Sequence, residues 1–266
     1  MKNKHTLALL FASLLLCVII RSFELIYMVD SATGFFKPEF RAIGICALVV
    51  ILAAVAVVSA FSSAAFREPK ASPEINLPLS LTSIALSVLT IYSLAFMPYF
   101  IQNSPFQKKM TMIFGVLFAL FFFIYSFKAI KDFKIISIAY TIPTIFWIFK
   151  LMGIFTEISA ISLITENIFN ILSGCAVLVF MLEFSRFECF GKKDPNPTLL
   201  ASGIAAFMLC TLASVPPLCA ALVLGADHIH ENNVNIFTLL FTGLFIIVFI
   251  VSHFKDKTES RYKHSL

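Results

Sequence analysis

Long blocks of apolar residues are the feature of this sequence that most limits how the chain can fold. An apolar segment of 18 or more residues predicts a helix that crosses a lipid bilayer. The predicted spans cover residues 6–29, 42–64, 79–100, 110–127, 135–155, 162–185, 199–225 and 235–254. At about 1.5 Å per residue, each can cross a hydrocarbon core of about 30 Å, the shortest with little to spare.

The composition excludes a water-soluble fold. Hydrophobic residues make up 59% and charged residues 13% of the 266-residue chain, whereas soluble domains are about 45–50% apolar and about 25% charged. Transmembrane barrel strands alternate apolar and polar residues, which these blocks do not. We therefore predict an all-α polytopic transmembrane helical bundle of about eight spans. Because the connections are too short to fold separately, residues 1–266 form one domain.

The lysines and arginines of the connections predict the orientation of the bundle. Fourteen lie on one side and four on the other. The first group is Lys2, Lys4, Arg67, Lys70, Lys128, Lys131, Lys134, Arg186, Lys192, Lys193, Lys255, Lys257, Arg261 and Lys263, and the second is Lys37, Arg41, Lys108 and Lys109. Both termini are therefore predicted to be cytoplasmic, which agrees with an even number of spans.

Charged and amide side chains inside the spans mark the candidate site, because each ionisable group there costs about 2.5–3.5 kcal/mol on insertion scales. Arg21 and Glu24 are three residues apart, so they share a helical face and are within reach of an ion pair. The further members of the set are Lys150 in the fifth span and Glu166, Asn167 and Asn170 in the sixth. The rise per residue places all six in the outer third of the bilayer.

Three interpretations of this polar layer stay open. It is a substrate or ion site that opens outward, a salt-bridge network that joins the first, fifth and sixth spans, or a layer in which Arg21 and Lys150 reach to the outer headgroups. Pro216 and Pro217 fall at the same level and are expected to kink or break the seventh span. Pro143 is expected to bend the fifth span before Lys150.

No catalytic residue, metal site or cofactor is expected. The sequence contains no phosphate-binding Gly-x-x-x-x-Gly-Lys motif, no His-Glu-x-x-His and no Gly-x-Ser-x-Gly. The six cysteines form no Cys-x-x-Cys pair and are interpreted as packing residues. The segment Asp227-His228-Ile-His230-Glu231 has only two histidines and is interpreted as a solvated loop. The 31 phenylalanines are expected to suit lipid contact and loose packing better than tight helix crossings.

Several segments resemble an uncharacterised family of multi-pass membrane proteins from clostridia and related low-GC Gram-positive bacteria. They are Asp30-Ser-Ala-Thr-Gly34-Phe-Phe, Phe146-Trp-Ile-Phe-Lys150-Leu, Ile161-Ser-Leu-Ile-Thr-Glu166-Asn167-Ile-Phe-Asn170-Ile-Leu, Arg186-Phe and Ala213-Ser-Val-Pro216. The resemblance implies a bacterial plasma membrane location and no particular activity. It also implies that Lys150, Glu166 and Asn167 belong to the shared pattern, from which Pro217 departs because a basic residue follows the first proline in the family.

Three classes of function remain from the sequence. A small-solute transporter or permease predicts a hydrated cavity lined by the charged layer. A non-catalytic sensor or partner subunit of a membrane complex predicts polar side chains that are satisfied in pairs. A membrane-embedded enzyme requires a groove open to lipid with a catalytic pair in reach. The expected partners are membrane lipids, a small solute and a protein partner; no basic stripe interleaved with aromatics is present, which excludes nucleic acid.

Overall fold

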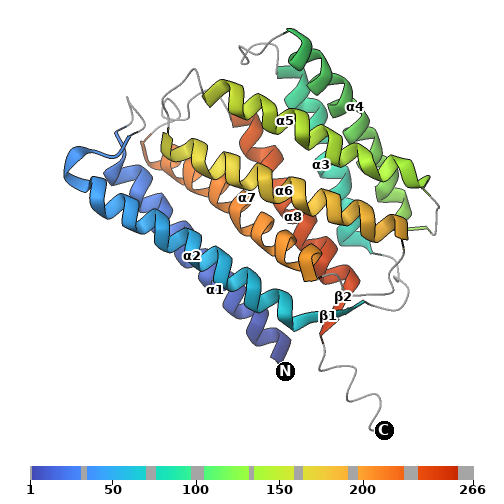
Figure 1. Cartoon of the computed structure of the whole chain (residues 1–266), viewed down its shortest axis with the longest axis horizontal. Coiled ribbons are helices and arrows are strands. Elements are labelled where there is room, and N and C mark those ends of the chain that lie inside the picture. The colour runs from blue at the N-terminus through green and yellow to red at the C-terminus, as the bar shows by residue number, and fades with distance from the viewer. Residues whose placement is uncertain are drawn as a thin grey trace.

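The computed structural model describes residues 2–30, 35–69, 76–96, 105–131, 135–158, 164–190, 197–224 and 233–256 (Figure 1). Eight α-helices fill most of these ranges. They are α1 (Lys2–Phe23), α2 (Arg41–Ala65), α3 (Leu77–Phe96), α4 (Pro105–Lys128), α5 (Ile142–Ile158), α6 (Ile164–Phe190), α7 (Pro197–Leu224) and α8 (Asn233–His253). A π-helical turn, η1 (Glu24–Met28), extends α1, and two 3₁₀ turns, Pro38–Phe40 and Ser137–Thr141, precede α2 and α5.

All eight helices are long and apolar enough to cross a membrane, so the predicted all-α bundle is confirmed. Their apolar segments run Ala8–Met28, Pro38–Ser63, Leu77–Ala95, Phe106–Lys128, Ser137–Phe155, Ile168–Cys189, Pro197–Leu224 and Ile236–His253. Each of them overlaps one predicted span. The chain is therefore an integral, multi-pass membrane protein.

Two short strands at one end of the bundle were not predicted. Strand β1 (Phe66–Pro69) follows α2, and β2 (Phe254–Asp256) follows α8. They pair antiparallel, with Phe66 opposite Asp256 and Pro69 opposite Phe254. The pairing joins the ends of α2 and α8 at the end of the bundle where α1 begins (Figure 1). The first and last helices therefore have their outer termini at the same end of the bundle, as an even number of crossings requires. That this end is cytoplasmic stays a prediction.

The prolines do not break the helices that contain them, so of the predicted kink or break of the seventh span the break does not occur. Pro216 and Pro217 both lie inside α7, which continues from Pro197 to Leu224 without a break. A pair of adjacent prolines frees only two carbonyls, and neighbouring helices make such a defect tolerable in a membrane. Pro143 lies in the first turn of α5, where a missing N–H breaks no helical hydrogen bond.

Helix α7 connects two parts of the bundle. Helices α1 and α2 pack on each other and on α7, and α7 also packs on α6 and α8. Helices α3, α4 and α5 complete the larger part through α3–α8, α3–α4, α4–α5 and α5–α6 contacts. Figure 1 shows α1 and α2 side by side along one flank of the molecule.

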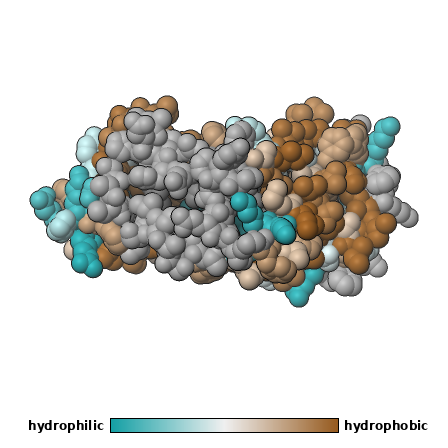
Figure 2. Space-filling model, turned by 90° about the horizontal axis from the view of Figure 1, so that it is seen from above, coloured by the Kyte–Doolittle hydropathy of each residue, from teal (hydrophilic) through white to brown (hydrophobic). Residues whose placement is uncertain are grey.

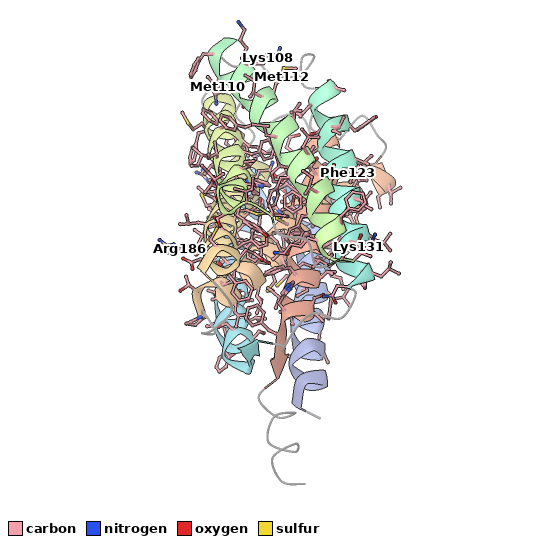
Figure 3. The ribbon with its side chains drawn as sticks, turned by 90° about the vertical axis from the view of Figure 1, so that its right-hand side faces the viewer. Lys108, Met110, Met112, Phe123, Lys131 and Arg186 are labelled. Atoms are coloured by element: carbon pink, nitrogen blue, oxygen red, sulfur yellow. The ribbon has the colours of Figure 1, made fainter. Side chains whose placement is uncertain are left out.

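The outward faces of the helices are apolar, as a lipid-facing surface requires. Phe61 and Leu222 are 71% and 87% exposed, respectively. Brown apolar patches cover much of the described surface in Figure 2. Lys108 lies near the start of α4 and Lys131 lies just beyond its end, so the two lysines mark opposite ends of this helix. The apolar residue Phe123 lies between them (Figure 3).

Many phenylalanines pack in the interior where helices meet, which corrects the expectation that they suit lipid contact and loose packing better than helix crossings. Phe184 of α6 is fully buried and lies within 6.5 Å, centroid to centroid, of six other aromatic rings. These rings belong to Phe121, Tyr125, Tyr140, Phe180, Phe245 and Phe249. Rings from α4, α6, α8 and the turn before α5 therefore form one cluster.

Candidate functional site

The predicted Arg21–Glu24 ion pair is present and buried. Arg21 Nη1 donates a hydrogen bond to Glu24 Oε2 at 2.9 Å, and the two side chains are only 2% and 1% exposed. Helix α1 changes to a π-helical turn at Glu24, and the turn closes where Val29 N–H donates to the Glu24 carbonyl oxygen. Such π turns inside α-helices frequently occur at functional sites.

Neighbouring side chains complete the surroundings of this ion pair. The Arg21 guanidinium lies 4.8 Å from the centre of the Phe169 ring of α6, a cation–π geometry that favours a desolvated cation. Glu24 Oε1 accepts no hydrogen bond in the described part of the chain. A buried carboxylate oxygen without a donor is costly. The ion pair is thus closed by an aromatic ring on one side and keeps an unused acceptor.

Lys150 lies in a different local environment. Its ammonium is 4.7 Å from the Trp147 ring centre on the same helix, and it is in electrostatic reach of the Cys210 thiol of α7. Thr144 and Trp147 precede it at steps of three on α5, and both Thr144 Oγ1 and Trp147 Nε1 are buried with no hydrogen-bond partner among the described residues. Lys150 and the polar atoms of Thr144 and Trp147 therefore form a second polar group, on α5.

Of the three residues predicted in the sixth span, the structure describes the side chain of Asn170 alone. Asn170 is half-buried, next to Phe169, and its carbonyl oxygen accepts a hydrogen bond from Ser173 Oγ at 2.9 Å. Glu166 and Asn167 lie on α6, but their side chains are outside the described part of the structure. That all six predicted residues form one site stays a prediction. Among the described residues, the Arg21 guanidinium of α1 contacts the Phe169 ring of α6.

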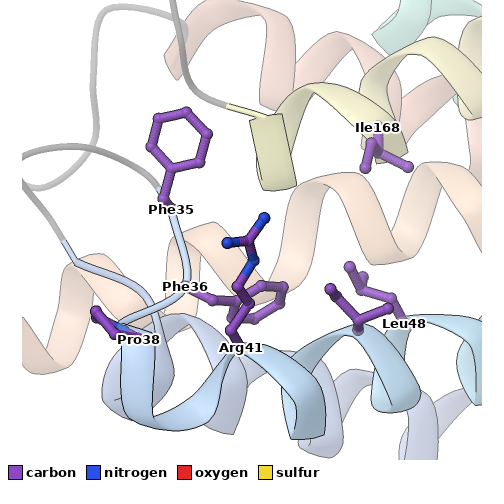
Figure 4. A pocket seen from close by; sticks show the side chains of 7 residues that line it. Phe35, Phe36, Pro38, Arg41, Leu48 and Ile168 are labelled. Carbon is purple, nitrogen blue, oxygen red and sulfur yellow. The ribbon is translucent and has the colours of Figure 1, made fainter.

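A cleft that sequence reasoning did not predict lies beside this ion pair, at the end of the bundle that is predicted to face outward, and is named the outer cleft here. It has a volume of about 630 Å³ and is lined by Phe35, Phe36, Pro38, Arg41, Ile45, Leu48 and Ile168. The Arg41 guanidinium extends from α2 into the space between Phe35 and Ile168 (Figure 4). The other described lining side chains are apolar, so this part of the cleft combines one cation with a hydrophobic wall.

Consecutive residues on α6 connect the cleft to the ion pair. Ile168 lines the cleft, and the ring of the next residue, Phe169, covers the Arg21 guanidinium. Successive side chains on a helix point about 100° apart. The first turns of α6 therefore have the cleft on one side and the buried ion pair on the adjacent side.

A third polar cluster, at the predicted cytoplasmic end, was missed from the sequence. Lys128 Nζ contacts Glu188 Oε2 at 2.5 Å and donates to the Tyr140 hydroxyl at 2.6 Å. Tyr125 O–H donates to Glu188 Oε1 at 3.1 Å. Each Glu188 oxygen therefore has a partner, and the cluster joins α4, α6 and the 3₁₀ turn before α5. The available signal was an acidic residue placed among aromatics just beyond the predicted end of the sixth span.

Replacing Glu188 with glutamine is expected to lower the free energy of unfolding by about 1–2 kcal/mol, since the amide keeps the Tyr125 bond but loses the charge-assisted contact with Lys128. Lys128 is 24% exposed and can turn to water, which limits the cost. Thermal unfolding in detergent measures the effect. Glu39→Gln, an exposed carboxylate without a described partner, is the matched control; equal losses in the two variants would contradict a stabilising role for the cluster.

The remaining expectations concern metals and cysteines. The Asp227–Glu231 segment lies outside the described residues. Within the described part, no group of three or more His, Cys, Asp or Glu side chains gathers around a point. All six cysteines are free thiols, and of these Cys17 and Cys210 are buried.

Comparisons with known proteins add no relative. No family model matches the chain, and no curated protein or solved structure matches it. The fold and the buried ion pair thus define the chain as a multi-pass helical membrane protein with charged groups inside its spans.

Proposed function

We propose that the chain transports a small solute across the bacterial plasma membrane, and that the solute moves between the outer cleft and the Arg21–Glu24 pair. The observation that carries this proposal is a buried ion pair inside a membrane span, one aromatic ring away from an open cleft. Ionisable groups inside spans commonly mark substrate or ion pathways. The plasma membrane location follows from the family resemblance of the sequence.

The unused oxygen of Glu24 supplies a binding chemistry. Oε2 is held by Arg21, whereas Oε1 has no described donor. An N–H or O–H group of a solute can donate to Oε1 while the ion pair stays intact. An anionic group of a solute can instead share the Arg21 guanidinium, which offers five donors.

The helix arrangement offers a way to open this site. Helices α1 and α2 contact the rest of the bundle mainly through α7, and Phe169 of α6 closes the ion pair from the other part. A displacement of α1 and α2 relative to α6 separates Arg21 from Phe169 and extends the cleft inward. Rigid-body movement of one helix group against another is the common mode of alternating access in transporters.

A non-catalytic sensor or partner subunit is the second candidate. It is favoured by Arg21 and Glu24 pairing with each other and by the fully bonded Glu188 cluster. A membrane-embedded enzyme lacks such support, because the described lining of the cleft contains no carboxylate, histidine or cysteine.

Cysteine labelling separates the first two candidates without knowledge of the solute. Cys17, Arg21 and Glu24 lie at positions i, i+4 and i+7, on one face of the first span, and Cys17 is 4% exposed. In a variant that keeps only Cys17, we expect a membrane-impermeant methanethiosulfonate applied outside intact cells to label this thiol. The reaction requires water to reach one turn below Arg21, as it does in an outward-open transporter.

The control is Ser87→Cys in a chain without other cysteines. Ser87 is equally buried, at 3%, but it lies on α3 and bonds to the Ala119 carbonyl oxygen of α4. Labelling at position 17 should exceed labelling at position 87. Failure of both thiols to react, beside a reactive Lys37→Cys at the outer surface, would favour the non-transporting component.

A further inference from the structure

The guanidinium of Arg41 is the one charged group in the described lining of the outer cleft. No carboxylate or other acceptor pairs with Arg41 in the part of the chain that the structure describes. Arg41 is exposed, and its guanidinium projects from α2 into the space between Phe35 and Ile168 (Figure 4). A guanidinium binds carboxylate and phosphate groups through two parallel hydrogen bonds and is weakly hydrated for a cation. The cleft therefore selects for an anion.

The walls require the same ligand to carry an apolar part. Every other described lining residue is apolar: the guanidinium end lies between Phe35 and Ile168, and the Phe36 ring lies beside the Arg41 stem (Figure 4). A small hydrophilic anion would leave this wall in contact with water. The volume of about 630 Å³ falls in the range of about 300–1,000 Å³ that is usual for sites of small organic molecules.

The order of residues on α2 gives the ligand a direction. Arg41, Ile45 and Leu48 lie at positions i, i+4 and i+7, so they follow one another down one face of the helix. Arg41 is the fourth residue of the apolar segment Pro38–Ser63, which places it at the membrane boundary. Ile45 is 49% exposed, and so the apolar wall continues onto the lipid-facing surface of α2.

We propose that the outer cleft binds a single-chain anionic amphiphile, that is, a phosphate or carboxylate carried on an alkyl chain. Its anionic group pairs with Arg41, and its chain runs along Ile45 and Leu48, entering sideways from the outer leaflet. The inference rests on the proposed function in one respect: the cleft is the entrance that leads to Arg21, so this chemistry also describes the solute.

The test is thermal unfolding of the full-length protein in dodecyl maltoside, titrated with dodecyl phosphate. A ligand that binds the folded state raises the unfolding midpoint in proportion to its affinity. Dodecyl phosphate should stabilise the protein, whereas inorganic phosphate and dodecyltrimethylammonium should not. Equal stabilisation by inorganic phosphate would overturn the requirement for a chain. Tighter binding of phosphatidylglycerol would assign the cleft to a two-chain lipid and overturn the single-chain ligand.

Two variants locate the binding. Arg41→Gln should raise the dissociation constant for dodecyl phosphate by about tenfold or more, while Lys109→Gln, which removes an exposed cation outside the cleft, should not change it. Ile168→Trp fills the cleft without changing its charge and should abolish binding; it serves as the test if Arg41→Gln does not fold. Binding that survives both changes in the cleft overturns the proposal.

The binding experiment and the Cys17 labelling experiment can fail independently of each other. If Cys17 is labelled from outside but dodecyl phosphate does not bind, transport stands and the ligand class is wrong. If dodecyl phosphate binds at Arg41 and Cys17 never reacts, the cleft is an amphiphile site on a protein that does not transport.

Discussion

Arg21→Met is expected to lower the free energy of unfolding by about 3–5 kcal/mol, which is the usual cost of leaving one member of a buried ion pair alone. Glu24 is 1% exposed, and its described partner is the Arg21 guanidinium at 2.9 Å. Methionine fills much of the space of the arginine stem but offers no donor. The carboxylate would then be buried without a counterion. Reversible unfolding in mixed micelles measures the loss.

The chain contains a matched control for this variant. Arg186 and Glu183 form a second pair with the same spacing and the same 2.9 Å contact, but the Arg186 side chain is 60% exposed. Glu183 itself is 8% exposed, but water reaches the guanidinium that pairs with it, so Arg186→Met should cost clearly less than Arg21→Met. A loss in Arg21→Met as small as that in Arg186→Met would mean that water reaches Glu24 in the folded protein.

A double variant separates stability from function at the same position. Replacing Arg21 and Glu24 together with methionine removes both charges, and such replacements of buried ion pairs are often neutral or stabilising. We expect the double variant to recover most of the stability lost in Arg21→Met. Under the transport proposal it nevertheless loses solute uptake, because the binding groups are gone; under the alternative of a non-transporting component, restored folding restores function.

The spans and the local ion pair were predictable because both depend on nearby residues. An apolar block of sufficient length forms a helix whatever its neighbours are, and residues three apart meet on any helix. The outer cleft was not predictable in this way. Its lining comes from the segment before α2, from α2 itself and from Ile168, more than one hundred residues further along the chain. Only tertiary packing brings these segments together.

The Glu188 cluster was missed for a different reason. The sixth span was predicted to end at residue 185, whereas α6 continues to Phe190. Glu188 therefore appeared to belong to a polar connection, where a carboxylate needs no explanation. One more helical turn places the Glu188 carboxylate where it accepts a hydrogen bond from the Tyr125 hydroxyl and contacts Lys128.

The aromatic residues show that the sequence of a membrane helix does not indicate which of its faces is buried. A soluble helix has a polar face that identifies its buried face, but a membrane helix is apolar all round. The segment Phe121-Phe122-Phe123 is an example: Phe121 and Phe122 are buried, whereas Phe123 is 45% exposed. The sequence does not distinguish these neighbours, and the helix rotation that does so is set by packing.

Phe184→Ala is the second large expected effect, at about 3–4 kcal/mol of lost unfolding free energy. In a membrane the unfolded helices stay in lipid, so the transfer part of the usual cost largely disappears. The cavity part remains: about 24 cal/mol per Å³ over roughly 100 Å³ gives about 2.4 kcal/mol. The six ring contacts of Phe184 supply the rest, about 1 kcal/mol in all, because an isolated aromatic pair contributes about 0.5–1.5 kcal/mol and the surrounding rings keep their contacts with one another.

Phe123→Ala is the control, because it removes the same atoms from a residue that is 45% exposed and has one described ring neighbour, Phe127 at 5.2 Å. Lipid fills the space, and the loss should stay below about 1 kcal/mol. Phe184→Leu should fall between the two, since leucine refills part of the cavity. If Phe184→Ala and Phe123→Ala cost the same, lipid or detergent enters the bundle at Phe184, and the aromatic cluster is not the element that holds α4, α6 and α8 together.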